Sequence, residues 1–315
     1  MTPPLPSYGA RPALNRLLAE TLALWPQHAR YLATSMANRS DTVLDVSDRV
    51  AAIVLALADD AGGIAKAVAD YRFLCEEIVL PEELHFRREG RYRLSTFTEA
   101  NAEVYSNGAF MDRYMNGLLF SNVIWHNHSH AMTDYVTRYL PRLPHGADHL
   151  EIGPGHGIFL YFASEVADIG SVTGWDLSPA SIAKTAHALR TLGVTRPVRL
   201  IEQDMFDVVD PTDSDRVDSI VMSEILEHVE DPVAALRSAA RSLRRGGHIW
   251  INVPANSPSP DHIFLVESPE HANQIVRDAG LEVVASAAYP MMGASLEKAA
   301  KNQLSVSCVV TARKS

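Results

Sequence analysis

The stretch His149-Leu150-Glu151-Ile152-Gly153-Pro154-Gly155-His156-Gly157 carries the strongest structural signal in this chain. It begins as an apolar strand and continues into glycines at alternate positions, which allow a tight turn and let a ligand lie against main-chain N–H groups. Residues 158–167 then show a helical pattern, so the segment predicts a strand, a glycine loop and a helix. The glycine spacing differs from that of dinucleotide-binding loops, and Glu151 would repel a pyrophosphate but suit a cationic ligand.

Strand-like and helix-like segments alternate after this unit. The predicted strands are 149–152, 171–176, 199–203, 217–222 and 248–253, followed by a terminal pair at 282–288 and 304–311. The predicted helices are 158–167, 179–192, 231–243 and 268–279. Such alternation specifies an α/β fold with a parallel sheet wrapped by helices. Ligands of these sheets bind at the carboxyl ends of the strands, near the point where the strand order reverses.

The glycine loop resembles the first motif of the class I S-adenosylmethionine (SAM) methyltransferases. The segment from Glu224 to Pro232 closely resembles the E-x-L-E-H-x-x-D-P segment of the ubiquinone-biosynthesis-like members of that family. Leu243 to Asn256 resembles the family's helix end, Gly-Gly turn and fifth strand. The resemblance covers about residues 146–315. It implies a Rossmann-like SAM-binding catalytic domain, a sheet whose last strand pair is antiparallel, and SAM as the cofactor.

On this resemblance, each strand end would contribute to the cofactor site. Asp176 would accept hydrogen bonds from the ribose hydroxyls, although it could instead cap the helix that begins near Pro179. Asp204 would accept from the adenine amine, unless it is only an exposed loop acid, and Met205 or Phe206 would cover the ring. The predicted cofactor-binding residues are Glu151, Gly153, Gly155, Gly157, Asp176, Leu177, Asp204, Met205 and Ser223.

The segment after the fourth predicted strand would lie beside the transferred methyl group. Glu224 and His228 are four residues apart and could share one helical face as catalytic residues. His228 could act as a general base for a hydroxyl, amine or carbon acid, or it could merely fix the loop. Asn256 and His262 follow the fifth strand and are candidates for the substrate pocket, with loop structure as the alternative.

The histidine-rich segment from Trp125 to His130 precedes the first strand, where enzymes of this family place a helix over SAM. On a helix His126 and His130 face the same way, as in half of a metal site. The third ligand would then be Glu224, His228 or His262. We favour a lid whose polar residues, including Asn127, touch SAM, and we predict no bound metal. His126 and Asn127 are then pocket candidates, and His130 is a catalytic candidate.

Aromatic residues near this segment offer a second reason to expect a pocket. Tyr105, Tyr114 and Trp125 could surround the sulfonium of SAM, because cations favour the faces of aromatic rings. The alternative is that each of them packs in a helical core.

The chain ahead of residue 146 is predicted to be a helical cap over residues 13–145, after a flexible tail at 1–12. Helix breaks are expected at Pro26, Asp41, Gly62-Gly63, Asn107-Gly108 and Asn116-Gly117. Residues 86–95 show a hairpin pattern with a turn at Glu89-Gly90. Helices followed by such a hairpin resemble the winged-helix dimerisation module of many small-molecule O-methyltransferases, which implies a homodimer. A plain helical cap is the alternative.

Composition narrows the choice of partners and compartment. The chain of 315 residues has 28 basic and 38 acidic side chains and a net charge of −10, which argues against a nucleic-acid partner. Its 2 cysteines favour a reducing cytoplasm over a disulfide scaffold. The longest apolar run, residues 50–58, is too short to cross a bilayer, and the proline-rich start does not look like a signal peptide.

These observations predict a SAM-dependent methyltransferase that acts on a small molecule, in bacterial specialised metabolism. One alternative uses the same cofactor as substrate: the amino group of SAM attacks its own γ-carbon and gives azetidine-2-carboxylic acid and methylthioadenosine. A second alternative is a non-catalytic SAM-binding subunit. For methyl transfer, catalysis would consist mostly of alignment and desolvation of the reacting groups.

Overall fold

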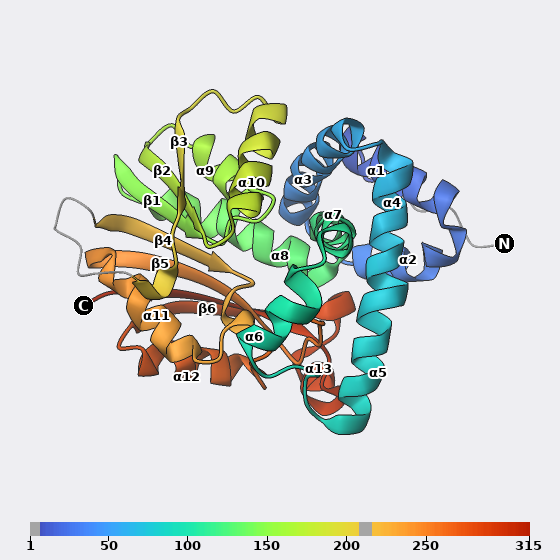
Figure 1. Cartoon of the computed structure of the whole chain (residues 1–315). Coiled ribbons are helices and arrows are strands. Elements are labelled where there is room, and N and C mark those ends of the chain that lie inside the picture. Colours follow the sequence, from blue (N-terminus) through green and yellow to red (C-terminus); the bar gives the residue numbers. More distant parts are fainter. Residues whose placement is uncertain (1–6, 208–215) are drawn as a thin grey trace.

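A computed structural model describes residues 7–207 and 216–315, with a twisted sheet on one side and a group of helices on the other (Figure 1). Half of the predicted tail, residues 1–6, lies outside the described residues. The strands are β1 (Ala147–Ile152), β2 (Ile169–Asp176), β3 (Val198–Glu202), β4 (Val217–Ser223), β5 (Leu243–Ala255), β6 (Glu282–Pro290) and β7 (Val306–Arg313). They form a 7-stranded sheet in the order β3-β2-β1-β4-β5-β7-β6.

The predicted sheet topology is confirmed. Strands β1 to β5 are parallel, whereas β7 runs antiparallel to both β5 and β6. The strand order reverses between β1 and β4, so the carboxyl ends of these two strands diverge into loops on opposite sides. This is the position at which open α/β sheets bind their ligands.

Helices cover both faces of the sheet. Those that follow β1 to β6 are α9 (Ile158–Ser164), α10 (Pro179–Thr191), α11 (Pro232–Arg241), α12 (Pro269–Asp278) and α13 (Leu296–Asn302). Three of them begin at side-chain caps with proline in the first turn, because Ser178, Asp231 and Ser268 each accept a hydrogen bond from the backbone N–H three residues on. Alternate strand residues enter two cores: Val221 packs on the α9 and α10 side, and Ile220 packs on the α11 and α12 side.

The chain ahead of β1 is helical throughout its described part. Its helices are α1 (Pro12–Leu24), α2 (Ala29–Met36), α3 (Asp41–Asp60), α4 (Ile64–Phe73), α5 (Leu80–Glu89), α6 (Phe97–Ala100), α7 (Gly108–Ile124) and α8 (His126–Asp134). Short 3-10 and π-helical turns connect several of them, including η1 (Pro26–His28) and η2 (Leu74–Val79). The expected breaks occur at Pro26, Asp41, Gly62-Gly63 and Asn107. The break expected at Asn116-Gly117 does not occur, because α7 runs through it.

The predicted hairpin over residues 86–95 is wrong. Helix α5 continues to Glu89 and ends at Gly90, whose φ of 67° makes it a left-handed helix cap and not a hairpin turn. A helical ion pair between Glu83 and Arg87 supports α5 in the place where the sequence suggested a strand. No strand precedes β1 in the described residues, so this region lacks the β-hairpin that defines the wing of a winged-helix module.

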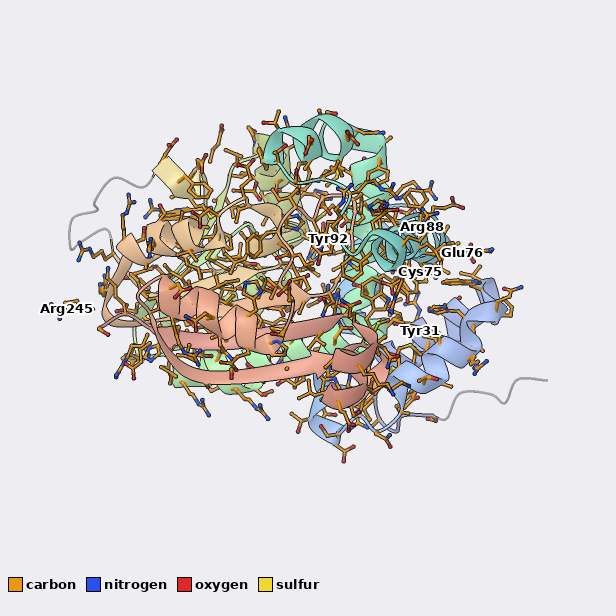
Figure 2. All side chains as sticks on the ribbon, turned by 90° about the horizontal axis from the view of Figure 1, so that it is seen from below. Tyr31, Cys75, Glu76, Arg88, Tyr92 and Arg245 are labelled. Atoms are coloured by element: carbon orange, nitrogen blue, oxygen red, sulfur yellow. The ribbon has the colours of Figure 1, made fainter. Side chains whose placement is uncertain are left out.

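The helical part and the sheet share one hydrophobic core. Leu14 of α1, Phe120 of α7, Trp250 of β5 and Val309 of β7 belong to the same cluster of buried side chains. Figure 2 shows the extent of the molecule, with Tyr31 and Cys75 in the helical part and Arg245 at the far end of the sheet. Among the described residues, none of the helices has the length and apolar character that crossing a membrane requires.

A buried arginine fixes the corner between α7 and α8. Arg39 is 7 % exposed and donates 2.9 Å hydrogen bonds to the carbonyl oxygens of Val123 and Ile124, at the carboxyl end of α7. A cation is favoured at that end of a helix, where carbonyl groups lack partners within the helix. These bonds fix the place where α8 starts, from which Asn127 reaches Ser307 of β7 while Trp125 donates to the Tyr71 hydroxyl of α4.

Candidate functional site

A cavity of about 1950 Å³ lies where the carboxyl ends of β1, β2 and β4 meet helices α7 and α8. The glycine loop, the strand ends and both helices contribute to its wall, and one arm reaches Trp25, Tyr31 and Cys75 in the helical part. Ligand pockets usually enclose roughly 300–1,000 Å³. The cavity therefore has room for SAM and for a second molecule beside it.

The glycine loop forms one wall of the cavity at the end of β1. Gly153 and Gly155 have φ angles of 69° and 52°, which favour glycine. A side chain at Gly153 would also collide with Ile225, because a Cβ there would lie 2.2 Å from Cδ1 of that residue. Gly157 begins α9 and does not line the cavity, so its contribution is the shape of the loop. Met115 of α7 covers Gly155 from the other side.

The carboxyl group of Glu151 indicates whether this wall of the cavity could bind the cationic part of SAM. It lines the cavity and is 2 % exposed, and its Oε2 atom is a buried oxygen without a hydrogen-bond donor in the part of the chain that the structure describes. Burial raises the pKa of this carboxyl well above its usual range. A cationic group in the cavity would supply the missing partner, so the residues fit the charged end of SAM.

Asp176 lies at the end of β2, as predicted, and lines the cavity. Its carboxylate already accepts 2.9 Å and 2.5 Å hydrogen bonds from the Ser178 N–H and the Ser181 hydroxyl. Burial raises its pKa, and these two donors oppose that shift. The helix-capping role that competed with ribose binding belongs to Ser178, whose hydroxyl accepts from the Ser181 N–H, and Asp176 supports the turn ahead of that cap. This support and ribose binding are compatible, because a carboxylate has about four acceptor positions.

Four further residues of the predicted cofactor set line the same end of the cavity: Leu177, Asp204, Met205 and Ser223. Asp204 accepts a 2.8 Å hydrogen bond from the Phe206 N–H, which turns the chain after β3. Ser223 ends β4 and accepts a 3.2 Å hydrogen bond from the side-chain amide of Asn252. We call these four residues, together with Asp176, the cofactor strip, because they follow one another along the carboxyl ends of the strands.

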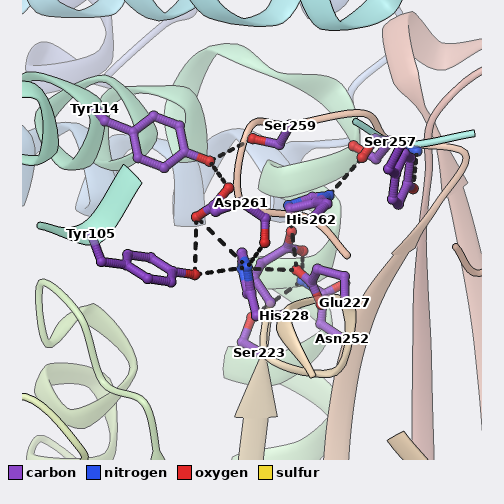
Figure 3. A network of polar contacts seen from close by, with 12 residues as sticks. Tyr105, Tyr114, Ser223, Glu227, His228, Asn252, Ser257, Ser259, Asp261 and His262 are labelled. Atoms are coloured by element: carbon purple, nitrogen blue, oxygen red, sulfur yellow. Dashed lines mark hydrogen bonds and ion pairs between the residues drawn. The ribbon is translucent and has the colours of Figure 1, made fainter. Parts of the chain in front are cut away.

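A buried polar network adjoins the β4 end of this strip, because the side-chain amide of Asn252 donates to both Ser223 and Glu224, and Figure 3 shows how its side chains converge. The hydroxyl of Tyr114 donates to Oδ1 of Asp261 at 2.8 Å, and that of Tyr105 donates to Oδ2 at 3.4 Å. Burial would raise the pKa of the Asp261 carboxyl. The adjacent His228 and His262 and the Tyr114 hydrogen bond outweigh that effect and hold it below the usual range.

The second half of the network consists of Glu224, Glu227, His228, Asn252 and His262. The Asn252 amide donates to Oε1 of Glu224 at 2.7 Å. Burial raises the pKa of the Glu224 carboxyl to about 7, and burial together with the neighbouring Glu224 raises that of Glu227 well above its usual value. Burial lowers the pKa of His262 to about 4.

Glu224 and His228 do not share a helical face as expected. Glu224 adopts a φ of 54°, a strained value for a residue with a side chain, and only Leu226–His228 forms a short 3-10 turn. The turn brings His228 toward Asp261, whose carbonyl oxygen lies 3.0 Å from Nδ1 of the histidine. Glu224 and His228 both still line the cavity.

The predicted substrate-pocket residues divide into two groups. Tyr105, Tyr114, Trp125, Asn127 and His262 line the cavity. Asn127 also ties α8 to β7 through a 3.1 Å hydrogen bond to the Ser307 hydroxyl. Asn256 does not line it: with a φ of 48°, it donates to the Glu267 carbonyl and shapes its own loop.

His126 and His130 stack on each other on α8, with ring centroids 3.9 Å apart, so their expected helical geometry is present. Neither lines the cavity. His130 packs against Tyr289 of β6, and His126 lies against Gly293 in the turn that follows. The structure thus does not bring this pair to the predicted third ligands.

Sequence reasoning missed several residues that shape the site, above all Glu227, Asp261, Asn252 and Met115. Glu227 and Asp261 each precede a histidine that was singled out, and an acid beside a histidine in two separate loops was the available signal. For Asn252 and Met115 there was no local signal, because their roles depend on contacts between elements far apart in sequence.

Comparisons with known proteins agree with this arrangement. A family model described as a methyltransferase domain matches residues 124–286. A ubiquinone biosynthesis O-methyltransferase of Alkalilimnicola ehrlichii is 30% identical over 145 residues, which are 45% of this chain and 55% of that protein. The protein of the same name from Xanthomonas oryzae pv. oryzae (strain PXO99A) is 32% identical over 134 residues, 42% of this chain and 53% of that one. The chain thus spans about half the length of these curated relatives.

The YcgJ protein from Bacillus subtilis aligns with a TM-score of 0.47 and 15% identity over 60% of this chain and 100% of that chain.

Proposed function

This chain belongs to the methyltransferase-domain family of class I SAM-dependent enzymes, and on that premise we propose that it methylates a hydroxyl group of a small molecule held in the cavity. The observation that supports the proposal is the size of the cavity, about 1950 Å³, which leaves space beyond the cofactor strip. The relatives named above are O-methyltransferases of ubiquinone biosynthesis, which favours a hydroxyl acceptor and a biosynthetic role.

In this proposal residues 146–315 hold SAM and residues 13–145 form a cap that closes the cavity. Glu151 faces the charged end of the cofactor, the backbone around Gly155 lies along it, and Asp176 binds its ribose. Bound SAM supplies an electrophilic methyl group on a cationic sulfur. Met115 and Tyr114 of α7 cover the site from the cap, and they would exclude water from the reacting groups.

The polar network receives the acceptor hydroxyl. His228 reaches the cavity from the β4 loop, and Asp261 and Tyr105 hold its ring from the opposite side. Glu224 also reaches the cavity and would take the proton that the hydroxyl releases when the new oxygen–carbon bond forms. Methyl transfer then depends on holding oxygen, carbon and sulfur in line.

Product analysis tests this proposal against its two alternatives. The protein is incubated with SAM alone and with SAM plus a panel of catechols, phenols and aliphatic alcohols, and adenosine products are separated by mass spectrometry. We expect S-adenosylhomocysteine only when an acceptor is present. Methylthioadenosine in the absence of an acceptor would show that SAM is cyclised, and no turnover with any member of the panel would contradict the hydroxyl acceptor proposed here.

A matched pair of variants links the reaction to the polar network. We expect Glu224→Gln to retain SAM binding and lose most of its turnover, because the amide cannot take a proton. Glu165→Gln changes an exposed acid at the end of α9, outside the cavity, and should retain turnover. Equal activity in both variants would remove Glu224 from the reaction.

A further inference from the structure

We propose that Glu227, His228 and His262 form a binding site for a divalent transition-metal ion on the cavity wall. Oε1 of Glu227 lies 3.7 Å from Nε2 of His228 and 3.9 Å from Nε2 of His262. One ligand atom from each of the three residues fits within 4.8 Å of the others. These are the distances over which a single ion could contact all three after small side-chain rotations (Figure 3).

The hydrogen bonds of the two histidines fix which nitrogen faces Glu227. Nδ1 of His228 lies 3.0 Å from the Asp261 carbonyl oxygen, and Nδ1 of His262 lies 2.6 Å from that of Ser257. A carbonyl oxygen only accepts, so each Nδ1 carries a proton, and the lone pair of Nε2 is the one that each ring can offer to a metal ion. Metal-binding histidines are held in this way, with the second ring nitrogen donating to a carbonyl or carboxylate.

Glu227 faces these lone pairs without a donor of its own. It is 0% exposed, and among the described residues its carboxylate oxygens lack a hydrogen bond from an N–H or hydroxyl donor, while the Glu224 carboxyl is near enough to share a proton with it. Two imidazole nitrogens and a carboxyl group therefore converge in a buried place. A bound cation satisfies all of them at once, whereas one proton satisfies only one pair.

Two imidazoles and one carboxylate favour a zinc-like ion over Mg²⁺, which prefers oxygen ligands. Ligand atoms about 2.0–2.1 Å from a tetrahedral zinc ion lie roughly 3.4 Å apart. The three side chains would therefore have to move slightly closer together to bind the ion. Three protein ligands also leave a coordination position open. His228, His262 and Glu224 line the cavity, so an ion can enter from it and an acceptor oxygen can reach that position.

This site differs from the one considered for the histidine-rich segment. His126 and His130 stack beside β6 and are not members of the converging group. The metal site weighed from the sequence combined that pair with a third ligand from Glu224, His228 or His262, whereas residues of the β4 and β5 loops alone carry the present proposal.

The experiment measures metal binding without SAM or acceptor, so its outcome does not depend on methyl transfer. The full chain is stripped with a chelator and titrated with Co²⁺, whose visible absorption reports a four- or five-coordinate site, and then with Zn²⁺ or Mg²⁺ as competitor. We expect one Co²⁺ per chain, displacement by Zn²⁺, and no displacement by Mg²⁺. Failure of the wild-type protein to bind Co²⁺ or Zn²⁺ in stoichiometric amount would overturn the proposal and show that the cluster holds a proton instead.

Variants assign the site to its residues. Glu227→Gln and His262→Gln should weaken Co²⁺ binding by more than the roughly 10–100-fold typical of an outer hydrogen-bond partner, while His130→Gln should bind normally. Circular dichroism identifies a variant that does not fold, in which case the other two ligand variants, with His228→Gln as the third, decide the outcome. Normal binding in the folded ligand variants, or lost binding in His130→Gln, would refute the assignment.

Discussion

The hydroxyl of Tyr114 on α7 donates a 2.8 Å hydrogen bond to Oδ1 of Asp261, in the loop after β5, and both side chains are buried. The bond joins the helical part of the chain to the polar network of the sheet. Its loss would leave a buried carboxylate short of one donor in a place that water does not reach readily.

We therefore expect Tyr114→Phe to destabilise the protein by about 1.5–3 kcal/mol, the usual cost of removing a hydrogen bond to a buried charge. Turnover should fall as well, because Asp261 contacts the Nδ1 side of His228. Urea denaturation and initial rates measure the two effects. Tyr161→Phe, at a half-buried tyrosine on α9 outside the cavity, is the control. Equal stability in both variants would mean that the Tyr114 bond contributes nothing.

Asp176 can be tested for its two roles separately. Asp176→Asn keeps the size of the side chain and removes the charge that would hold the ribose, so we expect SAM to bind more weakly by about 1.5–3 kcal/mol. Ser181→Ala removes one of the loop donors and leaves the carboxylate in place. Calorimetric titration should show a much smaller change for Ser181→Ala. If both variants weaken SAM equally, the carboxylate serves the loop and not the cofactor.

Arg39 is expected to be among the most sensitive positions of the helical part. Arg39→Met would remove the guanidinium donor from the buried Val123 carbonyl and leave the Ile124 carbonyl with the Ser35 hydroxyl as its side-chain donor, and we expect a loss of about 2–4 kcal/mol in the free energy of unfolding. Arg39→Lys should not restore it, because an ammonium group cannot reproduce the planar set of donors. The control is Arg30→Met on the exposed side of α2. Chemical denaturation compares all three, and full stability in Arg39→Lys would show that charge alone is required.

Buried histidines should make the protein sensitive to acid. His149 is 0% exposed between Tyr135 and Ser219, and burial lowers its pKa from 6.5 to about 3. Between these two values the unfolded chain binds a proton that the folded chain does not. The contribution of His149 to the free energy of unfolding is therefore complete above pH 6.5. Below that pH it decreases by about 1.4 kcal/mol per pH unit.

Denaturation curves at several pH values between 7.5 and 4.5 (about three units) check this slope. His149→Gln should lower stability at neutral pH and flatten its dependence on pH, whereas the exposed His145→Gln should leave both unchanged. An unaltered slope in His149→Gln would assign the acid sensitivity to other groups.

The sequence was a good guide wherever the structure depends on neighbouring residues. The glycine loop and the seven strands follow from turn chemistry and hydrophobic pattern within short windows. The hairpin prediction failed because charged and apolar residues alternate from Arg91 to Leu94, as they would in a strand, whereas Arg87 to Glu89 are good helix formers and continue α5 up to Gly90.

The polar network could be predicted only in part, because two loops form it. His228 meets the Asp261 carbonyl across a sequence separation of 33 residues, which no local pattern encodes. The helical spacing of Glu224 and His228 was misleading for the same reason: contacts with Asn252 and Gly153 hold Glu224 and Ile225 in a conformation that no helix has.

The shared core also constrains how the protein can be made. Leu14 emerges early from the ribosome, yet its cluster includes Val309 of β7, so the core cannot close until that strand has been synthesised. Until then part of the apolar surface of α1, α3 and α7 stays exposed to solvent, where chaperones can bind it. A fragment that stops before β7 should accordingly aggregate, even though it carries the whole glycine loop and every residue of the polar network.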